Sequence, residues 1–588
     1  MSNRIESIRN EMKNNGLDCW YDSGTDPHLG EYIPRHWHTR EWITGFTGSA
    51  GIVLITHGFA GLWTDSRYFL QAEKELENSG IHLFRSGEKG IPDPEEWMVS
   101  NLPENATIGF NGKCLSAAKI ESWKNTFSDK KFSFIGDIDI INRVWVNRPK
   151  LPVNPVFRYD LTFSGESSSE KIQRIRQDLE KKHADALFLT LLDEIAWVFN
   201  IRGQDVDYNP LVISFAWIDR EQAVLFVDPE KITHETEFEL KKDGIVCRPY
   251  TDADDFIKEN SESRCVLTDR NRISSRHYNV IKNHALKTIE SDNPSYHFKS
   301  MKNETEQSGI KNAHIRDGAA MVRWMIWLNK TLPKKTLTEI SIADELEKIR
   351  SRQKNYKGLS FPTIAGYEEH GAIVHYSAKP ETASVIKPHG LLLVDSGAHY
   401  LDGTTDITRS LALSKPTNEQ KKHFTLVLKG MINLACAVFP EGTNGSNLDI
   451  LARKFLWKNG LNYGHGTGHG VGCFLNVHEG PQRISLNSNV PLKPGMIVSD
   501  EPGVYFEGKY GIRLENLILC KKSSNDGFLE FETITLCPID TNLIDTGLLT
   551  REEMMWLNMY HQTVYEKLAP LMDNDEKAIL RKMTMAVS

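Results

Sequence analysis

The stretch LLLVDSGAHYLDGTTDITR, residues 391–409, decides the fold of the chain. Its apolar run Leu391–Val394 predicts a strand that ends at Asp395, and the pair Asp402–Gly403 predicts a turn. A second strand-like piece then delivers Asp406. Carboxylates on two paired strands can point at one spot, where buried negative charges repel each other. The pattern therefore predicts a place that needs either a bound cation or a shared proton.

Segments further along the chain supply more side chains of this kind. The candidate residues are His465 and His469 in YGHGTGHGVG, His478 in NVHEGP, Glu501 and Tyr505 in SDEPGVYF, and Arg513 and Glu515 in GIRLEN. Taken singly, each has a plain structural explanation, because turn carboxylates and satisfied histidines are common. The glycine-rich run contains no GxGxxG between a strand and a helix, so a nucleotide site is weakly supported. Its glycines instead indicate backbone that passes close to a ligand.

Together these residues form an oxygen-rich set. It contains the carboxylates of Asp395, Asp406, Glu501 and Glu515 and the imidazole of His469. Two divalent cations would balance the four negative charges. A carboxylate site with one histidine favours the harder metals Mn²⁺ or Mg²⁺, with Zn²⁺, Co²⁺ and Fe²⁺ as alternatives. Two ions held about 3.5–4 Å apart can share a hydroxide and stabilise both ends of a hydrolytic transition state.

Length and composition restrict the classes of function. A chain of 588 residues predicts two to four domains, and its 40% hydrophobic and 25% charged residues are typical of a globular protein. The net charge of −8 argues against a general nucleic-acid binder. The start of the chain lacks an apolar signal region, and no run approaches about 20 apolar residues, so we expect no membrane partner. The eight scattered cysteines, without a Cys-x-x-Cys pair, predict reduced thiols and a cytoplasmic location.

The first half of the chain divides into two similar units. Residues 1–152 begin with an amphipathic helix and alternate strands with helices, which predicts an α/β domain. A linker rich in proline and serine follows. Residues 153–300 repeat the rhythm, and WVFNIRG at 197–203 is similar to WITGFTG at 42–48. We interpret the units as diverged copies of one domain, and two unrelated α/β units of similar rhythm remain the alternative.

Residues 301–588 predict two rounds of a helix pair followed by strands. Asn303 and Thr417 are expected N-caps, Ser446 or Asn447 is expected to cap a further helix, and GAIVHY at 371–376 is predicted as a strand. This repeat favours a pseudo-symmetric α+β domain with helices on one side of a curved antiparallel sheet and a site on the other. The C-terminal extension from about residue 525 is too apolar for a disordered tail, so we expect it to pack on this domain or to form a partner surface.

At this point the sequence resembles a known family. The set Asp395, Asp406, His469, Glu501 and Glu515 resembles the five-ligand signature of the pita-bread metallopeptidases, the superfamily of methionine aminopeptidase and prolidase. The segments GAIVHYS, LDGTTDITR, HGTGHGVGCFLNVHEGP and DEPGVYFEGKYGIRLEN are similar to those of three-domain Xaa-Pro aminopeptidases, also called aminopeptidase P. FTGSAGIVLIT and NIRGQDVDYNP extend the resemblance upstream. It implies two creatinase-like N-terminal α/β domains followed by a pita-bread α+β catalytic domain.

The resemblance also implies roles for the site residues. Asp395 would chelate one metal, Asp406 and Glu515 would bridge two, and His469 and Glu501 would hold the other. A hydroxide between the metals would attack the carbonyl carbon before proline, and Glu501 could pass a proton to the leaving nitrogen. The remaining roles fall on His478 for the oxyanion, on His375 and His465 for the substrate and its proline ring, and on Tyr505 and Arg513 for substrate contacts.

The expected function is therefore release of the first residue from peptides whose second residue is proline. It would use two divalent ions per chain, with Mn²⁺ favoured, and the family implies a homodimer. An Xaa-Pro dipeptidase is the close alternative, and a catalytically dead pita-bread domain that binds peptides or proteins is a second one. The sequence departs from the family pattern at Pro362 and at Glu368–His370, which could change the rim of the pocket but not the five ligands.

Overall fold

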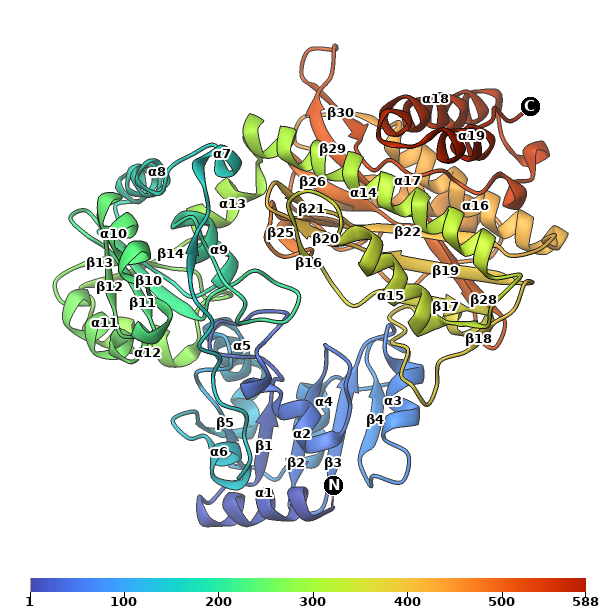
Figure 1. Ribbon diagram of the computed structural model, residues 1–588. Helices are drawn as coiled ribbons and strands as arrows, with labels where there is room; N and C mark the ends of the chain where they lie inside the picture. The colour runs from blue at the N-terminus through green and yellow to red at the C-terminus, as the bar shows by residue number, and fades with distance from the viewer. Residues whose placement is uncertain (1) are drawn as a thin grey trace. The chain divides into compact units, whose positions relative to one another are not determined.

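The computed structural model describes residues 2–588 (Figure 1). The chain forms two compact units. The first runs to Leu161 and includes Glu166–Tyr296, and the second combines Thr162–Gly165 with His297–Ser588. The first unit holds the bulk of both predicted N-terminal domains, and the boundaries at residues 152 and 300 stay predictions.

The first unit contains two six-stranded sheets of the same topology. Their strand orders are β4-β3-β2-β1-β5-β6 and β12-β11-β10-β8-β13-β14. In each sheet the earliest strand is central, with an antiparallel neighbour on one side and a parallel neighbour on the other. The outer pairs also match in direction. The strands are β1 Cys19–Asp22, β2 Ile52–Thr56, β3 Ala60–Thr64, β4 His82–Arg85, β5 Thr107–Phe110, β6 Ser133–Ile135, β8 Ala186–Leu189, β10 Ser214–Asp219, β11 Ala223–Val227, β12 Ile245–Arg248, β13 Cys265–Thr268 and β14 Lys287–Glu290.

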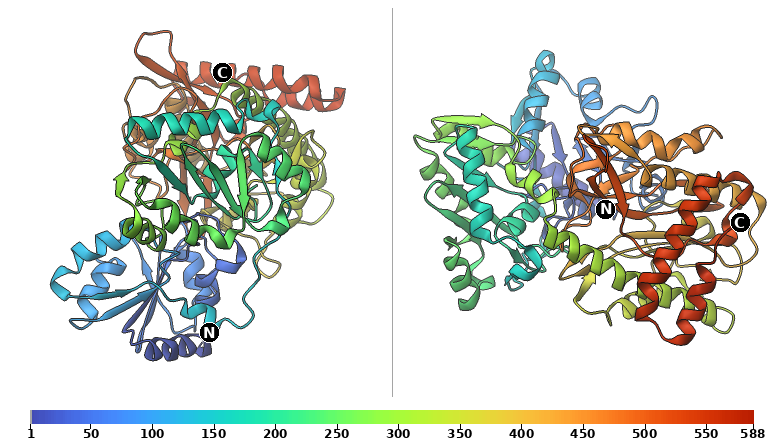
Figure 2. Two further views of the ribbon diagram at one scale, coloured as in Figure 1. Left: turned by 90° about the vertical axis from the view of Figure 1, so that its left-hand side faces the viewer. Right: turned by 90° about the horizontal axis from the view of Figure 1, so that it is seen from above.

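Amphipathic helices cover these sheets because their apolar residues recur every three or four positions. The helix α1, Ser2–Asn14, buries Ile5, Ile8 and Met12. The helix α8, Ser168–Lys181, begins after its N-cap Ser167, whose side chain accepts from the N–H of Glu170. Figure 2 shows helices on both faces of the second sheet.

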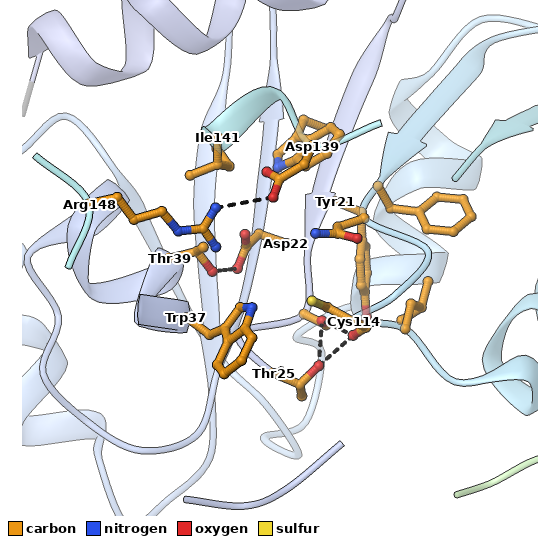
Figure 3. A pocket seen from close by; sticks show the side chains of 14 residues that line it. Tyr21, Asp22, Thr25, Trp37, Thr39, Cys114, Asp139, Ile141 and Arg148 are labelled. Carbon is orange, nitrogen blue, oxygen red and sulfur yellow. Dashed lines mark hydrogen bonds and ion pairs between the residues drawn. The ribbon is translucent and has the colours of Figure 1, made fainter. Parts of the chain in front are cut away.

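A small cavity lies at the carboxyl ends of β1 and β5 (Figure 3). Open α/β sheets often bind ligands in such a crevice. Here side chains fill it, since Thr39 donates to Asp22 at 2.9 Å and Arg148 pairs with Asp139 at 3.1 Å. The remaining volume is about 20 Å³, which suffices for a single water. We therefore assign it no substrate.

The second unit carries two helix pairs and two main sheets. The three-stranded sheet has the order β17-β19-β22, and the six-stranded sheet has the order β23-β30-β29-β26-β24-β25. The helices are α14 Glu304–Thr331, α15 Glu339–Arg350, α16 Asn418–Ala435 and α17 Gly445–Trp457. The strands of these sheets are β17 Ile364–Tyr367, β19 Leu391–Ser396, β22 Ile407–Ala412, β23 Val438–Pro440, β24 Gly468–Gly470, β25 Glu479–Ile484, β26 Ile497–Asp500, β29 Asn516–Lys522 and β30 Phe528–Thr533.

Two N-caps of these helices are confirmed, one is wrong, and one predicted strand is wrong. Asn303 and Thr417 each form a capping box. The cap of α17 is Asn444, whose side chain accepts from the N–H of Asn447. The segment GAIVHY begins in the 3₁₀ helix η5, Glu368–Ala372, and continues as a loop. Gly371 packs there against the backbone of Gly511, so the segment lies on a neighbouring hairpin instead of extending a sheet.

The C-terminal extension packs on the second unit, as one of the two expectations had it. The helices α18, Arg551–Leu568, and α19, Asn574–Met583, bury Leu557, Val564 and Leu580 in a core shared with α16. Within residues 2–588, no helix has the length and apolar character that crossing a bilayer requires.

His28 links the two domains of the first unit through buried contacts. Its Nδ1 lies 3.0 Å from the carbonyl oxygen of Thr190, and its Nε2 lies 3.1 Å from the hydroxyl of Tyr250. Burial lowers the pKa of His28 from the ordinary 6.5 to about 3. Between about pH 3 and pH 6.5, therefore, the imidazole of His28 stays neutral in the folded chain and binds a proton in the unfolded chain.

The contribution of His28 to stability is complete above pH 6.5 and is lost as the pH falls towards 3. We predict that between pH 6.5 and 4.5 the wild type loses up to about 1.4 kcal/mol more unfolding free energy per pH unit than His28→Gln. Denaturant unfolding of both proteins across this range measures the difference. Identical pH slopes for the two proteins would contradict the assignment.

Candidate metal centre

The three-stranded sheet places the first two carboxylates. Asp395 lies on β19 opposite Thr408 of β22, and Asp406 comes directly before β22. Between the strands the chain makes a short hairpin, in which β20, Ala398–Tyr400, pairs with β21, Gly403–Thr404. The two-residue turn lies at Leu401 and Asp402, one position before the predicted pair, because Gly403 already pairs with Tyr400. The strand β19 is buried along its whole length, and its register with β22 is what brings Asp395 to the site.

The third carboxylate reaches the same place from the six-stranded sheet. The backbone N–H of Glu515 donates to the carbonyl oxygen of Thr408 at 3.1 Å. The hydroxyl of Thr408 donates to Glu515 Oε2 at 2.8 Å. Thr408 therefore joins the two sheets where Asp395 and Glu515 meet.

His469 and Glu501 complete the group. Ligand atoms of Asp406, His469 and Glu515 lie within 4.8 Å of one another. His469 Nε2 is 3.5 Å from Asp406 Oδ2 and 3.6 Å from Glu501 Oε1. The charge of Asp395 acts on Asp406, Glu501 and Glu515 alike. The structure thus brings together the five residues predicted as ligands.

Glycines let the His469 strand fit between its neighbours. A Cβ at Gly468 would lie 1.9 Å from the carbonyl oxygen of Ser499, and one at Gly470 would lie 2.3 Å from that of Glu479. His469 Nδ1 lies 3.0 Å from the carbonyl oxygen of Gly470. A carbonyl oxygen only accepts, so Nδ1 carries the proton and Nε2 presents its lone pair to the carboxylates.

Electrostatics tests whether these residues suit metal ions. Burial, followed by repulsion from neighbouring carboxylates, raises the pKa values of Asp406 and Glu515 well above their ordinary range. Burial raises the pKa of Glu501 to about 7. Asp395 Oδ1 is buried and finds no hydrogen-bond partner among residues 2–588. Buried carboxylates that crowd together with too few positive charges to balance them fit divalent cations, and so does this oxygen-rich donor set.

A second chain of contacts joins the predicted substrate residues to this centre. Arg513 donates from Nη2 to Asp395 Oδ2 at 2.6 Å and from Nη1 to the hydroxyl of Tyr505 at 2.8 Å. That hydroxyl lies 2.7 Å from His465 Nε2. His465 Nδ1 lies 2.8 Å from the carbonyl oxygen of Gly466 and so carries its proton there. In this chain of contacts Arg513 therefore donates to Tyr505, and Tyr505 donates to His465.

The other two predicted histidines lie on separate segments. The ring of His478 lies against that of His469, with centroids 4.3 Å apart at 68°. His375 is half-buried in the loop after η5. Its neighbour Val374 accepts from Arg513 Nη2 at 3.4 Å. The structure thus links the loop of His375 to the centre through the backbone.

The sequence reasoning missed residues that hold this site together. Thr408 lies two positions after Asp406, a spacing that places it beside the centre on an extended strand. Arg453 pairs with Asp449 at 2.6 Å within α17 and donates to the carbonyl oxygens of Tyr463 and His465. The spacing of Asp449 and Arg453 by four was the available signal.

Family comparisons match consecutive parts of the chain. Residues 308–522 match the metallopeptidase family M24, residues 4–143 and 147–306 each match a creatinase/prolidase N-terminal domain, and residues 527–587 match the C-terminal region of peptidase M24. Aminopeptidase P1 of Arabidopsis thaliana is 39% identical over 652 residues, with 100% of both chains covered. The chain belongs to the aminopeptidase P family of M24 metallopeptidases.

Other aminopeptidase P relatives agree over the whole length. A probable Xaa-Pro aminopeptidase P of Coprinopsis cinerea is 38% identical and covers 98% of this chain and 97% of its own. The X-prolyl aminopeptidase of Caenorhabditis elegans, described as a cytosolic enzyme with a di-nuclear active site, superposes with a TM-score of 0.95 at 32% identity, covering 100% of this chain and 99% of its own. The predicted fold class and the prediction of a metallopeptidase are therefore confirmed.

We predict that Thr408→Val weakens metal binding about 10–100-fold, because it removes the hydroxyl that donates to Glu515. Calorimetric titration of metal-stripped protein with Mn²⁺ measures the change. Ser410→Ala is the matched control, since its hydroxyl bonds the backbone of Arg513 on the same strand. Equal affinities for the two variants would contradict the role of Thr408.

Proposed function

We propose that the chain is a metal-dependent Xaa-Pro aminopeptidase, which hydrolyses the bond between the first residue of a peptide and a proline in second position. The convergence of Asp395, Asp406, His469, Glu501 and Glu515 carries the proposal. Similarity to aminopeptidase P1 over the full length of the chain supports it.

The same five residues would hold two divalent ions. Mn²⁺ is the favoured ion because carboxylates dominate the donor set, with Zn²⁺, Co²⁺ or Fe²⁺ as alternatives. When bound, such ions supply a nucleophilic water at neutral pH and stabilise the negative charge of the transition state.

Glu501 is suited to carry a proton. Its carboxylate reaches the centre, with Oε1 3.6 Å from His469 Nε2, so it is placed to accept a proton there and to pass it on. The proline nitrogen in an Xaa-Pro bond carries no hydrogen and must gain one as the C–N bond breaks. We assign this transfer to Glu501.

The histidines and Arg513 would bind the peptide and its developing charge. His478, beside His469, is placed to donate a hydrogen bond to the oxyanion. The hydrogen bonds from Arg513 through Tyr505 hold the half-buried ring of His465 in one orientation, in which it would contact the proline ring. His375 would contact the substrate from the loop after η5.

The proposal also covers partners and location. We propose peptide substrates with proline second, no nucleic-acid or membrane partner, and a homodimer. The description of the Caenorhabditis elegans relative as cytosolic supports a cytoplasmic location.

Three matched peptides, Xaa-Pro-Yaa, Xaa-Pro and Xaa-Ala-Yaa, test the activity. We expect metal-stripped protein reloaded with Mn²⁺ to cleave Xaa-Pro-Yaa and to be inactive before reloading. Preference for the dipeptide would move the assignment to Xaa-Pro dipeptidase. Failure to cleave any of the three despite bound metal would favour a peptide-binding protein.

Glu515→Gln tests the centre itself. The amide keeps the shape of the side chain but removes a negative charge and an acceptor. We expect kcat/KM for Xaa-Pro-Yaa to fall by more than about 100-fold, beyond the effect of changing a residue behind the ligands. Glu507→Gln is the control, because Glu507 is exposed in the turn between β27, Gly503–Phe506, and β28, Tyr510–Arg513. Full activity of Glu515→Gln would refute the proposed centre.

A further inference from the structure

The loop that carries His375 runs from η5 to the short strand β18, Val385–Ile386. Its sequence, residues 371–384, is GAIVHYSAKPETAS, and it contains no strand. Ordering a loop of this length costs conformational entropy. Contacts that fix its ends offset this cost and can hold a side chain of the loop in one place. Tyr367, directly before η5, and Ser384, directly before β18, both hydrogen-bond to the first residue of α15.

That residue is Glu339, whose carboxylate is fully buried and accepts four donors. At the entry to the loop, the N–H of Tyr367 donates to Oε1 at 2.9 Å, and His370 Nδ1 lies 2.9 Å from the same oxygen. Inside the loop, the hydroxyl of Tyr376 donates to Oε2 at 2.8 Å. At the exit, the N–H of Ser384 donates to Oε2 at 2.7 Å. One carboxylate thus fastens entry, interior and exit.

Backbone contacts strengthen the exit. The N–H of Glu339 donates to the carbonyl oxygen of Ser384 at 3.2 Å. Beside it, β15, Leu337–Thr338, pairs antiparallel with β18. Glu339 begins α15, where the helix dipole stabilises a negative charge. The site therefore suits a carboxylate better than a neutral side chain.

The fastened loop contacts Arg513 and Tyr505. The carbonyl oxygen of Val374 accepts from Arg513 Nη2 at 3.4 Å. Ile373 packs in an apolar group with Tyr376 and Tyr505. His370 stacks on Tyr376 with centroids 4.4 Å apart. A shift of the loop would therefore move His375 relative to the chain of contacts between Arg513 and Tyr505.

We propose that Glu339, with His370 and Tyr376, forms a clasp that positions the His375 loop against bound peptide, so that Glu339 is a positioning residue for substrate recognition. The inference rests on the proposed function, because it takes His375 as a substrate contact. A carboxylate is required because an amide offers one acceptor oxygen, and its NH₂ group would face donors.

Glu339→Gln tests the clasp, with Asp344→Asn on the exposed side of α15 as control. Tyr376→Phe, which removes one donor and keeps the ring, is a milder variant. Glu339→Asp keeps the charge, so its KM should lie between those of the wild type and Glu339→Gln. We expect Glu339→Gln to raise KM for Xaa-Pro-Yaa about tenfold with little change in kcat or bound Mn²⁺, the effect of losing one charged hydrogen bond.

A second measurement follows the loop without catalysis. Glu381 is the one glutamate of residues 371–384 and is exposed. We expect a glutamate-specific protease to cut after Glu381 faster in Glu339→Gln and Tyr376→Phe than in the wild type or Asp344→Asn, as read by fragment mass. Unchanged cutting would overturn the clasp, and faster cutting with unchanged KM would overturn its role in positioning.

The two measurements separate this inference from the proposed function. If the wild type fails to cleave Xaa-Pro-Yaa, the proposed function fails, and with it the role in substrate recognition. If the wild type cleaves the peptide and Glu339→Gln behaves as Asp344→Asn does in both measurements, only the clasp fails. A variant that unfolds is replaced by Tyr376→Phe, which leaves the carboxylate and the ring in place.

Discussion

Repulsion among buried carboxylates is the constraint on which the second unit depends. Asp395, Asp406, Glu501 and Glu515 come from both main sheets and meet at one place, where burial disfavours the negative charges of Asp406, Glu501 and Glu515. Arg513 alone does not neutralise such a set. The surrounding structure holds the repelling groups together through hydrogen bonds such as those of Thr408. The favourable free energy of folding therefore has to offset the repulsion among these charges.

Backbone carbonyl groups beside the centre determine how the histidines are oriented. Backbone carbonyl oxygens of Gly466 and Gly470 fix the Nδ1 protons of His465 and His469. The Nε2 atoms are then left for a hydroxyl donor at His465 and for the carboxylate group at His469. Two histidines four positions apart thus take different chemical roles from the same local arrangement of backbone.

Sequence reasoning succeeded where a local pattern carried the information. The apolar strand before Asp395 and the N-caps Asn303 and Thr417 depend on neighbours within a few positions. It failed at GAIVHY, whose apolar residues have the composition of a strand. There a contact between distant glycines and the carboxylate of Glu339 overrode the local preference.

The ligand candidates could be predicted because carboxylates and imidazoles are typical metal ligands, whereas the residues that hold the ligands in place are of ordinary types. Thr408 and Glu339 act through partners that lie elsewhere in the sequence, up to 107 positions away for Thr408 and Glu515. A threonine on a strand or a glutamate at the start of a helix is ordinary in isolation. Their importance appears once the sheets and loops are assembled.

At Gly371 and Gly511 the loop that carries His375 lies directly against the backbone of a neighbouring strand. A Cβ at Gly511 would fall 1.8 Å from the carbonyl oxygen of Gly371, so these backbones lie as close as two chains can. Gly511 belongs to the hairpin of β27, Gly503–Phe506, and β28, Tyr510–Arg513, which carries Tyr505 and Arg513. A side chain at either glycine would therefore push residues 371–376 away from the strand that carries Arg513, so this narrow spacing sets how near the loop comes to the ligands.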